Sequence, residues 1–204
     1  MPLFMWPLLA MLGAYLLGSI SFAVVISRAF GLADPRSYGS GNPGATNVLR
    51  SGSKAAAALT LLLDAFKGWL PVTLALAGGL GAGTAALAGM AAFAGHVYPV
   101  FFGFRGGKGV ATALGVVLAL SPWLALAALA VFALVLAASR YVSLASIAAA
   151  LAAPLLLALP GPWPGGAVAV FAICVMAALL IWRHRANIGR LRAGTEARFG
   201  SKKT

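Results

Sequence analysis

Long runs of apolar residues constrain the fold of this chain more than any other feature of its sequence. The runs cover residues 3–26, 55–77, 82–102, 110–138, 144–159 and 167–182. A helix that rises about 1.5 Å per residue needs about 20 residues to cross a hydrocarbon core of about 30 Å. Only 9% of the 204 residues are charged, against about 25% in soluble domains. We therefore expect an all-α polytopic membrane protein with one domain, residues 1–204, and exclude water-soluble fold classes.

The few charged residues are mostly cationic and lie between the apolar runs. Fifteen lysines and arginines oppose three acids, for a formal net charge of +12. In a soluble protein this balance would indicate a nucleic-acid partner. We do not expect such a partner for a membrane bundle. Two interpretations stay open, cytoplasmic connections that follow the positive-inside rule and binding of an anionic substrate.

The positive-inside rule also predicts the number of spans. With the N-terminus outside and the first connection cytoplasmic, six spans would place the tail outside, although it carries seven lysines and arginines between residues 183 and 203. The conflict disappears if residues 110–138 form two helices broken at Ser121-Pro122, because proline is disfavoured inside a helix. We expect seven transmembrane helices, an outside N-terminus and a cytoplasmic C-terminus. The many small residues favour close helix packing.

The first polar segment, residues 39–50, combines three glycines with hydrogen-bonding side chains. Gly39, Gly41 and Gly44 have the spacing of a dinucleotide fingerprint, but no strand precedes them, so a nucleotide cofactor is not expected. Glycines still allow backbone N–H groups to approach an anion closely, and Arg50 suits phosphate. The alternative is a flexible turn. The candidate binding residues are Gly39, Ser40, Gly41, Asn42, Thr46, Asn47 and Arg50.

The second polar segment, residues 95–112, surrounds a lysine with glycines. It is not a P-loop, because Phe102 stands where that motif needs glycine. A cationic loop that opens a helix at about residue 110 nevertheless favours a phosphate, through the free N–H groups and dipole of the helix. The candidate binding residues are His96, Arg105, Gly106, Gly107, Lys108 and Gly109.

The two histidines lack the acid that a catalytic dyad would supply. Some phospholipid acyltransferases pair a His with an Asp five positions later. This sequence lacks that pair, because Phe101 stands five positions after His96 and Gly189 five positions after His184. His96 is interpreted as a structural histidine or, alternatively, as a catalytic base. No His, Cys and carboxylate cluster has the spacing of a metal site.

The third polar segment, residues 184–196, places His184 and Asn187 on one face if it is helical. An asparagine amide can orient a hydroxyl or polarise a carbonyl, whereas the arginines alone would suit a belt for lipid headgroups. Glu196 is expected to pair with a nearby arginine. Asp64 and Lys67, spaced i, i+3 within an apolar run, are able to pair and are either a structural ion pair or functional residues.

These segments together resemble one known family. SGNPGATNVLR (residues 40–50), GHVYPVFFGFRGGKGVAT (95–112) and HRANIGRLRAGTE (184–196) are similar to three motifs of the bacterial acyl-phosphate:glycerol-3-phosphate acyltransferases. The segment LLLDAFKG (61–68) matches as well. The order, spacing and hydropathy agree over nearly the whole chain, and Arg105, where relatives often carry lysine, keeps the charge.

This resemblance implies a reaction and a location. Acyl phosphate and sn-glycerol 3-phosphate would give 1-acylglycerol 3-phosphate and phosphate, the first acylation of phospholipid biosynthesis, without cofactor or metal. The site would lie among membrane lipids at the cytoplasmic face of the inner membrane, with a functional link to an enzyme that produces acyl phosphate. Ser40, Arg50, Lys108, His184 and Asn187 correspond by position to substrate-binding residues, and all of these except Arg50 are our catalytic candidates.

The residues favour a mechanism without a strong protein base. An acyl phosphate is already activated, so the enzyme mainly aligns reactants and stabilises charge. We expect a substrate phosphate oxygen to take the hydroxyl proton while Asn187 orients the hydroxyl. Two other classes stay open: a small transporter of a phosphorylated solute in which Asp64 couples to protons, and a non-catalytic lipid-binding subunit. No obvious inverted repeat supports the transporter.

Overall fold

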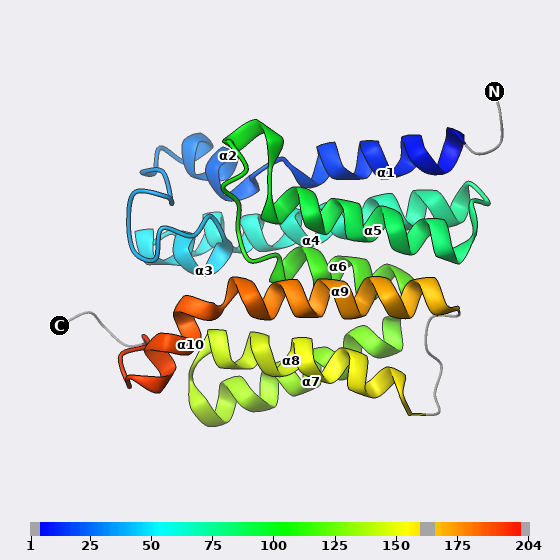
Figure 1. Cartoon of the computed structure of the whole chain (residues 1–204). Helices are drawn as coiled ribbons and strands as arrows, with labels where there is room; N and C mark the ends of the chain where they lie inside the picture. Colours follow the sequence, from blue (N-terminus) through cyan, green and yellow to red (C-terminus); the bar gives the residue numbers. More distant parts are fainter. Residues whose placement is uncertain (1–4, 160–165, 201–204) are drawn as a thin grey trace.

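The computed structural model describes residues 5–159 and 166–200, and within these ranges it contains helices and no strand (Figure 1). Two short 3-10 turns, Leu49–Ser51 and Val100–Phe102, accompany the helices. The helices are α1 (Met5–Gly18), α2 (Phe22–Ala29), α3 (Ala45–Val48), α4 (Lys54–Ala77), α5 (Gly81–Val97), α6 (Val110–Leu120), α7 (Pro122–Ser139), α8 (Val142–Leu157), α9 (Ala167–Arg183) and α10 (Arg185–Arg192).

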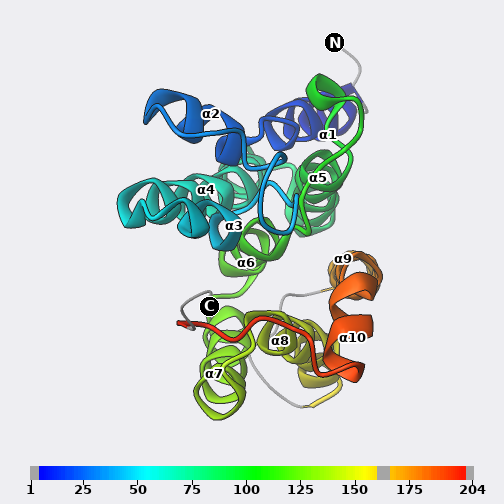
Figure 2. The ribbon, with the colours of Figure 1, turned by 90° about the vertical axis from the view of Figure 1, so that its left-hand side faces the viewer.

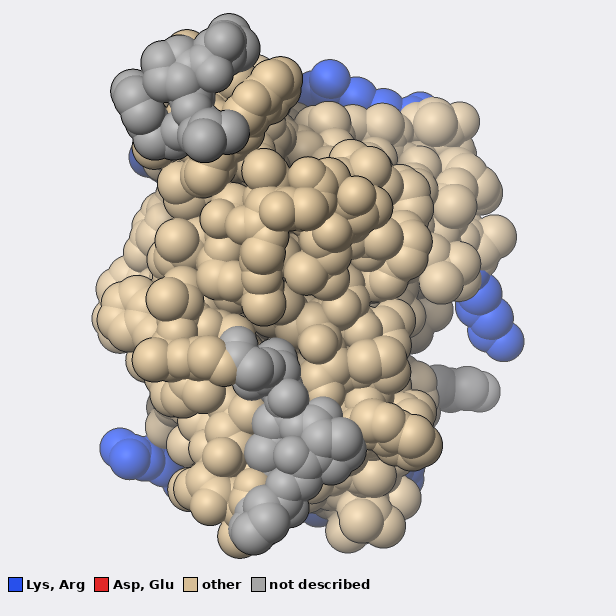
Figure 3. Space-filling view, turned by 90° about the vertical axis from the view of Figure 1, so that its right-hand side faces the viewer, with Lys and Arg blue, Asp and Glu red and all other residues tan. Residues whose placement is uncertain are grey.

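The long apolar helices lie side by side in one bundle, which Figure 1 shows from the side. Viewed from one end, α1 to α6 form one group and α7 to α10 another (Figure 2). The connection between α2 and α4, the loop between α5 and α6, and α10 all gather at the end that faces the viewer in Figure 2. The opposite end shows mainly uncharged residues, with lysines and arginines only at its edges (Figure 3).

The helices agree with a multi-pass membrane protein. Among the described residues, three segments are long and apolar enough to cross a membrane: α4, Gly81–Phe102 and α7. Two bent pairs, α1 with α2 (43°) and α9 with α10 (52°), raise the number to five. The helices α6 and α8 are apolar but shorter. The start of the expected run 3–26 and most of the connection 160–166 lie outside the described residues.

The expected break at Ser121-Pro122 is confirmed. Helix α6 ends at Leu120 and α7 begins at Pro122. The Ser121 hydroxyl accepts a hydrogen bond from the backbone N–H of Leu124 and so caps α7. Proline suits this first position because its nitrogen has no hydrogen to leave unpaired. The run 110–138 is therefore two helices.

Residues 3–26, expected as one helix, were predicted wrongly. The described part of this run is interrupted between Gly18 and Phe22, and α2 leaves α1 at an angle of 43°. The ammonium group of Lys67 in α4 donates a 2.7 Å hydrogen bond to the carbonyl oxygen of Ile20, within the interruption. A half-buried carbonyl outside a helix is satisfied by such a donor, and a lysine 47 residues away gives no local signal.

Glycines let neighbouring helices approach closely, as expected from the composition. A Cβ atom at Gly68 of α4 would overlap the backbone of Thr112 in α6, and one at Gly115 of α6 would overlap the carbonyl oxygen of Ala65 in α4. A Cβ atom at Gly18 of α1 would likewise overlap the backbone of α5. The group α1 to α6 is therefore held by contacts in which backbone packs against backbone.

Replacement of Gly115 by alanine should destabilise the bundle, because backbone atoms of α4 cannot turn aside as a flexible side chain can. Overpacking of about 1–3 kcal/mol corresponds to a thermal midpoint lower by about 3–10 °C in detergent. Gly13→Ala is the matched control, since a Cβ at Gly13 has no neighbour within 4 Å. Equal midpoints for the two variants would contradict the close α4–α6 contact.

Candidate active site

The first polar loop is held from behind by one buried side chain, Asn47. Its Oδ1 atom accepts a 3.0 Å hydrogen bond from the backbone N–H of Ser40. Its Nδ2 atom donates to the carbonyl oxygens of Pro35 and Tyr38 at 2.6 and 3.1 Å. Gly39, with φ of 60°, has no room for a Cβ before the Asn47 amide. Asn47 therefore fixes the loop and leaves Ser40 exposed at its tip.

The second polar loop lies between α5 and α6 and is fixed by its backbone. The Arg183 guanidinium, at the end of α9, donates to the carbonyl oxygens of Gly106 (2.7 Å) and Gly107 (3.2 Å). Gly109 precedes α6 with φ of 83°. A Cβ at this position would also overlap the ring of Phe93. The loop thus presents Lys108 from a rigid backbone at the start of a helix.

Lys108 and Asn187 meet although 79 residues separate them. The Lys108 ammonium group donates a 2.6 Å hydrogen bond to Asn187 Oδ1, and Asn187 Nδ2 donates a 2.6 Å bond to Glu196 Oε1. The same carboxylate accepts a 2.6 Å bond from Ser143 of α8 and pairs with Arg190 at 2.7 Å. The expected pairing of Glu196 with an arginine is confirmed. Asn187 is therefore held in one orientation between a cation and an anion.

Burial and neighbouring charges shift the pKa values of Lys108, Glu196 and His184. Burial lowers the pKa of the Lys108 ammonium group to about 8, with Glu196 opposing and nearby arginines adding to the shift. Burial raises the pKa of the Glu196 carboxyl, but hydrogen bonds from Ser143, Asn187 and Arg190 hold it below its ordinary value. Burial and the Lys108 charge lower the pKa of His184 to about 4. His184 is thus neutral at pH 7.

His184 joins α9 to α10 and is buried. Its Nδ1 atom lies 2.8 Å from the carbonyl oxygen of Leu180, and the residue is 2% exposed. The chain bends by 52° at this residue, which brings α10 and Asn187 back to the end of the bundle. The position of Asn187 therefore depends on the bend at His184.

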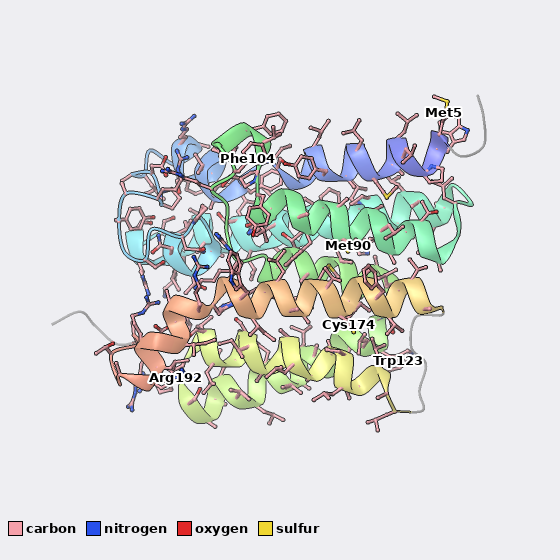
Figure 4. All side chains as sticks on the ribbon, viewed as in Figure 1. Met5, Met90, Phe104, Trp123, Cys174 and Arg192 are labelled. Carbon is pink, nitrogen blue, oxygen red and sulfur yellow. The ribbon has the colours of Figure 1, made fainter. Side chains whose placement is uncertain are left out.

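A pocket of about 260 Å³ lies where these loops meet. Cationic side chains and backbone of the glycine-rich loops surround it, at the end of the bundle where nitrogen atoms gather in Figure 4, away from Trp123 and Cys174. A phosphate suits such a site, because ammonium and guanidinium groups favour an anion. Its lining consists of Ser40, Gly41, Asn42, Gly106, Lys108, Arg183, Arg185, Ala186, Asn187 and Arg190.

The structure brings six of the expected site residues into this lining, one or more from each polar segment: Ser40, Gly41, Asn42, Gly106, Lys108 and Asn187. The others lie around it. Asn47 and Gly107 are buried behind the loops, His96 is buried in α5, and Arg105 is exposed beyond the lining. Arg50, also exposed, contacts Asn47 at 3.4 Å. Gly39, Thr46, Gly109 and His184 are likewise outside the lining.

Four lining residues are not expected from the sequence: Ala186 and the arginines Arg183, Arg185 and Arg190. The sequence alone favours a topology signal or a lipid-headgroup belt for the tail arginines. Their place in a motif-like segment beside His184 and Asn187 was the available signal, since topology alone needs no such neighbours. Arg185 also stacks on the exposed ring of Trp182 at 4.4 Å, at the edge of the pocket.

Comparisons with known proteins agree with this geometry. The family described as "Glycerol-3-phosphate acyltransferase" matches residues 8–194. A glycerol-3-phosphate acyltransferase of Bordetella petrii is 58% identical over 93% of this chain and 92% of its own length. One of Albidiferax ferrireducens is 57% identical over 97% and 91%, respectively.

Solved structures agree as well. The crystal structure of PlsY (YgiH), an integral membrane glycerol 3-phosphate acyltransferase, in its glycerol 3-phosphate form is 48% identical. It superposes with a TM-score of 0.88 over 95% of this chain and 96% of that chain. The lysophosphatidic acid form of PlsY gives 47% identity and a TM-score of 0.87, over 95% of both chains.

The helical bundle, its cationic pocket and these likenesses define an integral membrane acyltransferase. The match over residues 8–194, together with relatives more than half identical, places it further. The chain belongs to the glycerol-3-phosphate acyltransferase family.

Proposed function

We propose that this protein transfers a fatty acyl group from acyl phosphate to sn-glycerol 3-phosphate, as the first acylation of phospholipid biosynthesis. The observation that carries the proposal is the contact between Lys108 and Asn187 inside a pocket with three arginines. PlsY, 48% identical, has a glycerol 3-phosphate form and a lysophosphatidic acid form. These are the acceptor and the product that the proposed reaction requires.

The pocket offers groups for the phosphate of either substrate. Lys108 and Arg190 supply positive charge, and Asn47 fixes the first loop beside them by accepting a hydrogen bond from the backbone N–H of Ser40. Ser40 adds a hydroxyl at the same place. The donor's acyl chain would lie between apolar helices while its phosphate reaches this pocket, so that both substrates meet at the membrane surface.

Acyl transfer then needs alignment more than a strong base. The glycerol hydroxyl oxygen attacks the acyl carbon, a C–O ester bond forms, and the C–O bond to the donor phosphate breaks. Phosphate leaves, and one of its oxygens accepts the hydroxyl proton. Asn187 Oδ1 already accepts from Lys108 and has a second lone pair that can accept from the attacking hydroxyl. Neutral His184 holds the bend that places Asn187 there.

Phosphate release from acyl phosphate by detergent-purified protein tests the proposed function. Release is expected only when glycerol 3-phosphate is present, with one acylglycerol 3-phosphate formed for each phosphate. Acyl-CoA should not replace the acyl phosphate. The supply of acyl donor would therefore depend on an enzyme that makes acyl phosphate. Release without the acceptor, or transport of glycerol 3-phosphate without product, would contradict the proposal.

The proposed topology has seven transmembrane helices in the inner membrane: α1 with α2, α4, α5, α6, α7, α8 and α9. The N-terminus lies outside, and the C-terminus and the site are cytoplasmic. The gathering of cationic connections at one end supports this arrangement, because such residues are retained on the cytoplasmic side. The short helices α6 and α8 are covered in part by their neighbours, so the bundle can cross where each helix alone is short.

Cysteine labelling should reveal this topology. In a Cys174→Ser background, Ala82→Cys at the start of α5 should react with an impermeant reagent in intact cells. Ala193→Cys, beyond α10, should react only after the membrane is opened. Both positions are exposed, so a difference reports the side of the membrane. Labelling of Ala193→Cys from outside would refute the seven-helix topology.

A further inference from the structure

A buried ion pair lies in the bundle interior, outside the residues that line the pocket. Asp64 and Lys67 of α4 face each other at 2.8 Å, and their side chains are 3% and 1% exposed. The pairing expected from their spacing is confirmed. Charged residues inside a membrane bundle are unfavourable and often functional, and this pair needs an account beyond the stability of α4.

The pair contacts two other parts of the structure. The Lys67 ammonium group donates to the carbonyl oxygen of Ile20, between α1 and α2. The Asp64 Oδ1 atom also lies 3.6 Å from Nδ1 of His96 in α5. That Nδ1 atom is buried and has no hydrogen-bond partner among the described residues. The Asp64 carboxylate therefore approaches it as a charged neighbour, beyond hydrogen-bonding distance.

The backbone carbonyl and the ring of His96 both lie against the loop that carries Lys108. The backbone N–H of Gly107 donates a 3.1 Å hydrogen bond to the carbonyl oxygen of His96. A Cβ at Gly107 would overlap Nε2 of the His96 ring, and one at Gly106 would overlap the His96 carbonyl oxygen. The ring and the loop backbone are therefore in direct contact, and Lys108 is the next residue along the chain.

We propose that Asp64 and His96 are positioning residues for the phosphate-binding loop. Asp64, paired with Lys67, is the charged neighbour of the His96 imidazole on its Nδ1 side. The Nε2 edge of the ring then fixes the backbone of Gly107, so that the Lys108 ammonium group projects into the pocket. His96 acts through the loop and touches no substrate in this arrangement. The proposal rests on the proposed function, in which this loop receives the phosphate of glycerol 3-phosphate.

A mutant cycle tests this coupling, with KM for glycerol 3-phosphate measured for each variant. The double change Asp64→Asn/Lys67→Met removes both charges, so no unpaired charge stays buried. We expect this variant and His96→Gln each to raise KM for glycerol 3-phosphate about three- to tenfold, the size of one weakened polar contact. The change in kcat should be smaller than the change in KM. The three changes together should raise KM no further than either alone, because both act through one contact.

The structural alternative gives a different result. If the cluster only stabilises the bundle, the thermal midpoint falls and KM of the folded protein stays normal, or the KM effects multiply. Either result would overturn the proposal. Thr60→Val is the matched control, since Thr60 is a buried polar residue one turn from Asp64 in the same helix. It should leave KM unchanged.

Hydrogen exchange supplies a test that depends neither on activity nor on the folding of the double variant. In His96→Gln, amides of residues 106–109 should exchange faster than in the unaltered protein, while those of α4 keep their protection. Unchanged protection of the loop would overturn the proposal. Absence of acyl transfer in the unaltered protein would instead refute the proposed function, and the exchange result would still decide whether His96 holds the loop.

Discussion

Replacement of Lys108 by alanine should lower kcat/KM for glycerol 3-phosphate by about 10- to 150-fold. The lost group is an ammonium at the pocket surface, and a hydrogen bond from a charged group contributes about 1.5–3 kcal/mol. The change also removes the 2.6 Å partner of Asn187 Oδ1, so kcat should fall together with affinity. Steady-state kinetics of the purified protein, with both substrates varied, measures the two contributions.

Lys54→Ala is the control for this prediction. Lys54 begins α4 and is exposed outside the lining of the pocket. Its loss tests whether any positive charge in a polar connection serves as well as Lys108. Equal losses in the two variants would show that the contribution of Lys108 is generic attraction of anions, and the proposed phosphate contact would be wrong.

The pH profile of kcat/KM should carry the signature of Lys108. This constant reports ionisations of the free enzyme and free substrate. The ammonium group is charged below its pKa of about 8 and neutral above it, so kcat/KM should fall as the pH rises through 8. Lys108→Arg keeps its charge to far higher pH and should lack this descending limb. A wild-type profile that stays flat to about pH 9.5 would contradict the role of the ammonium group.

Local chemistry made some of the fold predictable. Apolar runs marked the helices, and Pro122 marked the division of residues 110–138, because proline removes a donor that a continuous helix needs. The interruption between Gly18 and Phe22 contains no proline, and its hydrogen-bond partner is Lys67. Local sequence therefore does not predict helix breaks that are stabilised by a residue far along the chain.

The same distinction applies to the site. Glycines around Lys108 and an amide at Asn187 are recognisable by their chemistry, and the structure brings these two residues together. The lining by Arg185 and Arg190 of α10 arises from the 52° bend after α9, and charge patterns do not predict bend angles. Asn47 reads as a ligand because it lies among polar residues, yet its amide is fully engaged with the backbone of its own loop.

Replacement of Asn187 by alanine should have the largest effect on the chemical step. The amide sits between the Lys108 ammonium group and the Glu196 carboxylate, which leaves it little freedom to reorient. Loss of one preorganised polar group at a reacting centre lowers kcat by about 10²–10³. We expect this loss at saturating concentrations of both substrates, where weaker binding no longer contributes.

His96→Gln is the comparison that decides which residue serves the reaction directly. If a substrate phosphate takes the hydroxyl proton, this variant should keep substantial kcat at saturation across about pH 6–9, around and above the second ionisation of a phosphate at about 6. His96 is buried against Asp64 and the loop backbone, so its loss should chiefly affect binding. A folded His96→Gln protein without activity, beside a nearly normal Asn187→Ala protein, would make His96 the catalytic base. The ratio of the two kcat values therefore separates substrate-assisted transfer from catalysis by a protein base.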